Sequence, residues 1–266
     1  MIETADIPQG LASSAATKIA RRLKSISGGK ILDVATGDGE FVRTLMKTLK
    51  DYDSFVGVDS SKKEVESARK QLKEQPVKIL EMNAEALHFE NDLFDTVCIS
   101  HSLHHLENID KVLDEMKRVL TPNGYFIVQE QFSDGKQTEA QKTSILQHQW
   151  DAKIDSLLGL SHHKTLTKKR IKDAVSKLQL REIEVLESTH SVKCLFCENK
   201  FKCENPKDEQ MVNQAIKEID KNLEKLKNHQ NSETQIHLTE QGRKLKERIR
   251  KSGVSEASYL FFIGKK

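Results

Sequence analysis

The sequence predicts an α/β fold: a Rossmann-like, mostly parallel sheet of seven strands, with helices on both faces and a helical insertion between the last two strands. Short apolar runs alternate with segments whose apolar residues recur at helical spacing, as in doubly wound proteins. The run 97–99 is apolar throughout, which indicates a parallel strand buried on both faces. The first apolar run ends in a turn in which Ala35, Gly37 and Gly39 occupy every second position.

The expected strands are apolar segments bounded by turn residues. They are 30–35, 54–58, 77–82, 94–100, 125–130, 180–187 and 259–263. The first five alternate with helices, so they should be parallel and joined by right-handed crossovers. The turn 121–124, which contains Pro122, should break the chain between the fourth crossover helix and the fifth strand.

Helices are expected where apolar residues recur every three or four positions. They are 12–23, 40–49, 62–73, 108–120, about 139–158, a helix capped by Thr165 or Thr167 that runs to 177, about 208–228 and about 239–251. Residues 1–188 and 257–266 should therefore form one core domain, with 131–165 as a lid over the sheet. Residues 189–256 should form the helical insertion.

Composition excludes several classes of protein. The chain has 266 residues, of which 36% are hydrophobic and 31% charged, with a net charge of +3. This charge is too small for the basic face of a nucleic-acid-binding protein. Apolar runs fall well short of the roughly 20 residues of a membrane-spanning helix, and the start of the chain lacks the pattern of a secretory signal. Four cysteines do not suggest a disulfide scaffold, so a reducing cytoplasm is expected.

The glycine turn after the first strand can serve either of two nucleotide-type ligands. A dinucleotide requires Gly-x-Gly-x-x-Gly, in which the third glycine allows close packing of helix and strand. With Gly37 and Gly39 as the first pair, the third position is Val42, which is not small. The dinucleotide interpretation is therefore disfavoured.

Ordered motifs in the first half of the chain resemble those of the class I S-adenosylmethionine-dependent methyltransferases. Asp33 stands four residues before Gly37, as in their motif I, and Asp59 ends the second strand. The later motifs are MNAEAL (82–87), FDTV (94–97) and MKRVLTPNG (116–124), the last of which resembles RVLKPGG in that family. The resemblance covers about residues 28–130 and the last strand.

The resemblance implies a cofactor site for S-adenosylmethionine. In the family the residue at Asp59 accepts the two ribose hydroxyls, which suits a carboxylate because it accepts two hydrogen bonds at once. The side chain at Asn83 and the backbone at Ala84 hold the adenine. The full set implied here is Asp33, Ala35, Thr36, Gly37, Asp59, Ser60, Asn83, Ala84, Ser100 and His101.

Two of the motifs, DVATGDG and NAEAL, are similar to those of the ubiquinone/menaquinone C-methyltransferases. That family usually has Gly-Leu-Arg-Asn after the fourth strand. This chain has Ser-Leu-His-His at 102–105, the form found in generic small-molecule methyltransferases. Ala35 replaces the commoner first glycine, as in some quinone enzymes. We therefore expect a small-molecule methyl acceptor, with quinone methylation as an alternative.

Methyl transfer from a sulfonium is an in-line displacement, so catalysis can come largely from positioning. A base is needed only if the acceptor must lose a proton. His101 is the first candidate for that base because it lies closest to the end of the fourth strand, and His105 is a second candidate. The alternative is that His101 contacts the cofactor or simply packs.

A second group of histidines follows the fifth strand. His148, Asp151 and Asp155 share one face of the expected helix, and His162 and His163 follow. This group is either a metal site, a polar substrate wall or a solvent-exposed helix face, and we favour the exposed face. Trp150, the only tryptophan, is either a substrate-facing residue or a core anchor.

Three cysteines open the insertion. Cys194, Cys197 and Cys203, with His190 as a fourth ligand, match the donor set of tetrahedral zinc. The second cysteine pair of the usual zinc pattern is missing, so unligated reduced thiols are the preferred interpretation. A thiol site for a soft metal or an arsenical is another. Cys98 is expected to pack in the core.

These expectations combine into a cytoplasmic S-adenosylmethionine-dependent methyltransferase that acts on a small molecule. Three rivals stay open: a methyltransferase of protein or RNA, a metal- or metalloid-directed methyltransferase using the three cysteines, and a methyltransferase-like binding module without catalysis. The long amphipathic helices of the insertion could also pair with a second copy to form a homodimer.

Overall fold

The computed structural model describes residues 15–188, 205–227 and 233–266. Its centre is a seven-stranded sheet in the order β3-β2-β1-β4-β5-β7-β6. The strands are β1 (Lys30–Val34), β2 (Ser54–Asp59), β3 (Val77–Glu81), β4 (Phe94–Ser100), β5 (Leu120–Gln131), β6 (Arg181–Ser188) and β7 (Tyr259–Lys265). The first five strands are parallel, and β7 runs antiparallel between β5 and β6. The predicted fold class is confirmed.

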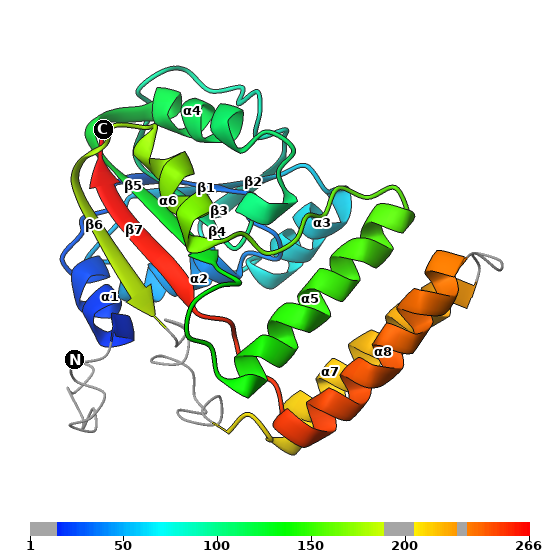
Figure 1. Ribbon diagram of the computed structural model, residues 1–266. Helices are drawn as coiled ribbons and strands as arrows, with labels where there is room; N and C mark the ends of the chain where they lie inside the picture. Colours follow the sequence, from blue (N-terminus) through cyan, green and yellow to red (C-terminus); the bar gives the residue numbers. More distant parts are fainter. Residues whose placement is uncertain (1–14, 189–204, 228–232) are drawn as a thin grey trace.

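Helices cover both faces of this sheet (Figure 1). On one face lie α4 (Ile109–Val119) and α6 (Lys168–Ser176), which pack on the strands through residues such as Val112 and Ile171. On the other face lie α1 (Ala15–Leu23), α2 (Glu40–Thr48) and α3 (Lys62–Gln71), which bury Leu23, Leu45 and Val65. Because β1 and β4 are covered on both faces, their apolar runs are continuous.

Three further helices form a unit beside the sheet (Figure 1): α5 (Glu139–Leu157), α7 (Glu209–Lys227) and α8 (Glu233–Ser252). They share a hydrophobic cluster of Trp150, Ile154, Ile219, Leu226, Leu238, Leu245, Ile249 and Val254. Trp150 is 2% exposed, and its indole N–H donates to the carbonyl of Leu238 at 2.8 Å. Trp150 is thus a core anchor of this unit and does not face a substrate.

Two element boundaries lie about five residues or more from the expected ones, and the others agree more closely. Strand β5 begins directly at Leu120, although Pro122 was expected to break the chain there. The ladder with β4 shifts register between Phe94 and Thr96, and Asn123 has φ of 66°, so this irregular stretch remains paired despite its proline. Helix α8 begins at Glu233, six residues before the expected start at Thr239.

The remaining expectations concern the cysteines and membrane-spanning helices. The cysteine cluster (Cys194, Cys197 and Cys203) and His190 lie outside the described residues. Cys98 is fully buried in the core. Within the described ranges, no helix combines the length and the apolar character needed to cross a membrane.

Candidate active site

The turn after β1 leaves its backbone open to a ligand. Ala35, Gly37 and Gly39 all have positive φ, of 53°, 53° and 83°. A Cβ added at Gly37 would meet nothing within 4 Å, whereas one at Gly39 would meet the side chain of Leu72 at 2.5 Å. Gly39 is therefore needed for packing at the start of α2, and Gly37 leaves space free at the cavity.

Two acids fix the geometry of this turn. Asp59, at the end of β2, accepts hydrogen bonds from the backbone N–H groups of Gly37 at 2.9 Å and Ser61 at 2.8 Å. Asp33 is 1% exposed and accepts from the Thr36 hydroxyl at 2.6 Å and from the Cys98 thiol at 3.3 Å. Burial raises the pKa of Asp33 to about 6, although both hydrogen bonds oppose that rise.

The turn borders a cavity of about 660 Å³, within the range of small-ligand and cofactor pockets. The predicted site residues that line it are Asp33, Ala35, Thr36, Gly37, Asp59, Ser60, Ser100, His101 and His105. Asn83 and Ala84, predicted to hold the adenine, do not line this cavity. The side chain of Asn83 instead accepts a hydrogen bond from the backbone N–H of Glu85 at 2.9 Å.

His101 stands where β4 ends, at the floor of the cavity. Its φ of 49° is unusual for a residue with a side chain, and its backbone N–H donates to the carbonyl of Gln129 at 2.8 Å. The ring Nε2 lies 2.6 Å from the side-chain nitrogen of Gln129. Burial lowers the pKa of His101 and so favours the neutral ring, which can accept a proton. Sequence reasoning missed Gln129, which is 5% exposed on β5.

A second cavity, of about 1100 Å³, adjoins the first. Its walls come from the end of β5, from α5, from α7 and from the segment before β7. The residues that line both cavities are Glu40, His101, His105 and Glu256. The space beside the glycine turn therefore continues toward the helical unit, with His101 and His105 at the boundary.

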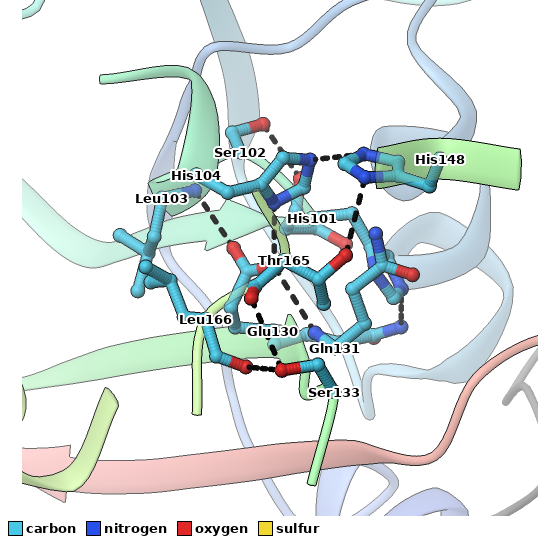
Figure 2. A network of polar contacts seen from close by, with 12 residues as sticks. His101, Ser102, Leu103, His104, Glu130, Gln131, Ser133, His148, Thr165 and Leu166 are labelled. Atoms are coloured by element: carbon cyan, nitrogen blue, oxygen red, sulfur yellow. Dashed lines mark hydrogen bonds and ion pairs between the residues drawn. The ribbon is translucent and has the colours of Figure 1, made fainter. Parts of the chain in front are cut away.

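Four histidines gather at this boundary: His104, His105, His148 and His162. One ring nitrogen from each lies within 4.8 Å of the others. Figure 2 shows the His104 and His148 rings facing each other, with Nε2 atoms 3.0 Å apart. His162 Nε2 lies 3.1 Å from His148 Nε2. Desolvation by burial, followed by repulsion from neighbouring rings, lowers the pKa of His104, His105 and His148 to about 3.

In three of these histidines, the other ring nitrogen, Nδ1, also has a polar partner. His104 Nδ1 lies 2.9 Å from Glu130 Oε1, His162 Nδ1 lies 2.7 Å from Asp155 Oδ2, and the Thr165 hydroxyl contacts His148 Nδ1 at 3.1 Å. Glu130 is fully buried, and burial raises its pKa to about 7. The contacts of His104 and His148 with Glu130 and Thr165 can be followed in Figure 2.

The preference for an exposed helix face at His148, Asp151 and Asp155 was wrong. All three are partly buried, and Asp151 accepts a hydrogen bond from the Asn222 side chain of α7 at 2.7 Å. Burial raises the pKa of Asp151 to about 6. His163, next to His162, is exposed and outside the cluster.

Residues 32–128 match the profile of a family described as methyltransferase domain. A demethylmenaquinone methyltransferase from Lactococcus lactis is 34% identical over 110 residues, which are 40% of this chain and 44% of that enzyme. This chain thus spans less than half of the length of that relative. The glycine turn lies within the part that matches the family profile.

Solved structures share the fold over nearly the whole chain. A phosphoethanolamine N-methyltransferase 2 from Haemonchus contortus, in complex with phosphomonomethylethanolamine and S-adenosylhomocysteine, gives a TM-score of 0.53 at 18% identity, over 94% of this chain and 52% of the other. The cyclase SpnF gives a TM-score of 0.57 at 14% identity, over 94% and 79% of the two chains.

Fold, motifs and family match agree. The protein has the fold of the class I S-adenosylmethionine-dependent methyltransferases, as predicted, and the match to the methyltransferase-domain profile lies within the part that carries β1 to β5.

Proposed function

We propose that this protein transfers the methyl group of S-adenosylmethionine to a small molecule held in the second cavity. The proposal depends on the two cavities being adjacent. The first is lined by Gly37 and Asp59, the residues of the glycine turn and of the end of β2, and it shares His101 and His105 with the second. A donor in the first cavity and an acceptor in the second would therefore meet at these two histidines.

The residues of the first cavity fit this cofactor. Asp59 Oδ1 and Oδ2 accept only one described hydrogen bond each, so the carboxylate retains lone pairs for two ribose hydroxyls. The free space above Gly37 allows the methionine part to approach the backbone. Gln129 also lines this cavity, next to His101.

When bound, S-adenosylmethionine supplies an electrophilic methyl group on a sulfonium. The chain contributes orientation, because β4 and β5 end at the boundary of the two cavities and hold their side chains there. Where the acceptor atom carries a proton, His101 takes that proton at Nε2, which requires the Gln129 amide nitrogen to move away from Nε2. Helices α5 and α7 of the helical unit form part of the wall of the second cavity, beside which the acceptor would lie.

The acceptor is a small molecule whose identity is set by α5, α7 and the segment before β7. These elements lie outside residues 32–128, which match the family profile. The histidines at 104 and 105 stand where the quinone enzymes usually have other residues, so this proposal does not extend to quinones.

Calorimetric titration with S-adenosylhomocysteine tests the cofactor assignment. We expect binding to wild type and a loss of at least ~10-fold in affinity for Asp59→Ala, because two charge-assisted hydrogen bonds of ~1.5 kcal/mol or more each would be removed. Glu85→Ala is the matched control, since Glu85 pairs with Lys111 outside the cavity. Absence of binding to wild type, or equal affinity in Asp59→Ala, would refute the assignment.

The similarity to a cyclase shows that this fold also accommodates other chemistry. Transfer of label from methyl-labelled S-adenosylmethionine to components of a metabolite extract separates a methyltransferase from a binding module. A protein that binds the cofactor product but never transfers label would be the binding module. The alternative that uses Cys194, Cys197 and Cys203 concerns residues outside the described ranges and stays a prediction.

A further inference from the structure

The geometry points to a binding site for a divalent transition-metal ion, of which zinc is the natural choice, formed by His104, His105, His148 and His162. The four rings come from three segments: the turn after β4, helix α5 and the loop before α6. His105 lines both cavities, His104 and His148 line the second, and His162 lies beside them. The proposed ligands do not include the cysteines of the insertion.

The spacing of the donor atoms supports a metal site. The Nε2 atoms of His104 and His162 lie 3.0 and 3.1 Å from that of His148. Tetrahedral zinc with nitrogen ligands at about 2.05 Å separates those nitrogens by about 3.3 Å. Shifts of a few tenths of an ångström therefore bring each of these two pairs to the separation of zinc ligands, and all the candidate donor atoms lie within 4.8 Å of one another.

The polar partners of the Nδ1 atoms also support a metal site. Metal-binding histidines usually donate their other N–H to a carboxylate or another oxygen, which fixes the ring orientation and its tautomer. Glu130, Asp155 and Thr165 take these places behind His104, His162 and His148. The same arrangement thus occurs three times, on three different elements.

The number of protons on the Nε2 atoms also bears on metal binding. Both oxygens of Glu130 accept backbone N–H groups, from Leu103 at 2.7 Å and Gln131 at 3.1 Å, and when Glu130 is ionised it also accepts from His104, which then carries its proton on Nδ1. The same holds for His162, which faces the Asp155 carboxylate. Their Nε2 atoms are then lone-pair donors.

Only His148 can place a proton between these rings. If the Thr165 hydroxyl donates to His148 Nδ1, His148 carries its proton on Nε2, and this N–H faces the lone pairs of His104 and His162. If the hydroxyl instead accepts from His148 Nδ1–H, none of the three Nε2 atoms carries a proton. The two contacts that His148 Nε2 makes with His104 Nε2 and His162 Nε2 therefore share at most one proton. A cation at their centre satisfies all three lone pairs, which packing of neutral rings does not.

The donor set also selects the class of ion. Four imidazoles suit zinc, cobalt, nickel or copper, whereas magnesium and calcium require oxygen ligands. Zinc accepts tetrahedral coordination without electronic preference. Because His105 is exposed and its described ring contacts are only with other histidines, it is the ligand most easily displaced.

The position of His105 gives the ion a role that rests on the proposed function. His105 lines both cavities, so a ligand that replaces it comes from the space of the acceptor. An acceptor with a hydroxyl, carboxylate or phosphate oxygen would bind the ion there and be held beside the cofactor cavity. Coordination would also lower the pKa of an acceptor hydroxyl.

Metal binding is measured with zinc alone and with cobalt(II) alone, in a background where Cys194, Cys197 and Cys203 are replaced by serine. We expect one equivalent of either ion per chain. Cobalt should show the visible bands of a tetrahedral nitrogen site without sulfur-to-metal charge transfer. No binding in this background, or a charge-transfer band, would overturn the inference.

Variants locate the ion. His148→Ala should abolish stoichiometric binding, and His163→Ala, an exposed histidine beside the cluster, should not change it. Asp155→Asn keeps every ligand and should weaken affinity about 10–100-fold, which tests the site if His148→Ala fails to fold. Unchanged affinity in both His148→Ala and Asp155→Asn would refute it.

The outcome is independent of the cofactor assignment. S-adenosylhomocysteine binding depends on Asp59 and the glycine turn, so it should survive in the metal-free protein. A protein that binds the cofactor product but no metal refutes only this inference. One that binds metal but no cofactor product refutes only the proposed function.

Discussion

Asp59 accepts the backbone N–H of Gly37 at 2.9 Å, which ties the end of β2 to the turn that follows β1. The two residues are neighbours because β1 and β2 pair in parallel from Lys30 with Ser54 to Val34 with Val58. Parallel pairing brings both carboxyl ends to the same edge of the sheet, where ligands of such folds bind. The contact therefore links sheet register directly to the shape of the candidate cofactor cavity.

Gly37→Ala should weaken ligand binding strongly and lower the stability of the fold only slightly. The added methyl group meets no protein atom within 4 Å but extends into the cavity, and φ of 53° costs about 1 kcal/mol for alanine. We expect a loss of S-adenosylhomocysteine affinity of at least ~10-fold, measured by calorimetry. Gly159→Ala is the control, because it also has positive φ and open space but lies outside the cavity. Equal affinities of the two variants would contradict the assignment of this turn.

Asp33 should make the protein less stable as pH rises. Its pKa is raised from 3.8 to about 6 in the folded protein. Below pH 3.8 both states are protonated. Between that pH and about 6 the unfolded chain loses the proton first, so the free energy of unfolding falls, by at most ~3 kcal/mol.

Urea denaturation of wild type and Asp33→Asn at a series of pH values measures this effect. The variant cannot ionise at this position, so its stability relative to wild type should rise by up to ~3 kcal/mol between pH 4 and pH 7. Parallel curves for the two proteins would show that the folded carboxyl ionises as it does in the unfolded chain.

His101→Asn tests the proposed base. Asparagine tolerates the positive φ of this position better than most residues, so the turn should persist. If His101 is the base, kcat should fall by about 10²–10⁴. Since burial lowers its pKa, the acid limb of the wild-type kcat profile should lie below pH 6.5 and disappear in the variant. A weaker affinity for S-adenosylhomocysteine with an unaltered pH profile would instead mean that His101 only contacts the cofactor.

The fold was predictable because its signals are local. The glycine turn, the apolar run of β4 and the capped helices between strands all show as spacing along the chain, and parallel pairing follows from their alternation. Strand β5 is longer than expected because Pro122 lies in a stretch where the ladder is irregular. The break predicted from Pro122 therefore ends the helix but does not delay the strand.

The histidine cluster was only partly visible in the sequence. Helical spacing correctly placed His148 and Asp155 on one face, but it also grouped them with Asp151, which contacts α7. The approach of His104 to His148 depends on how α5 packs beside the end of β4, a relation between segments 44 residues apart that no local pattern encodes. Similarly, Gln129 looks like any residue of a buried strand until its partner His101 is known.

Ser188 and Tyr259 are directly paired across the β6–β7 ladder. The whole stretch between them, which includes α7 and α8, thus leaves and rejoins the sheet at one point, as the loop of an enlarged hairpin would. Such a segment can be exchanged as a cassette without altering strand order or the glycine turn. One part of the gene can therefore diversify the roof of the second cavity while the cofactor half evolves under separate constraints.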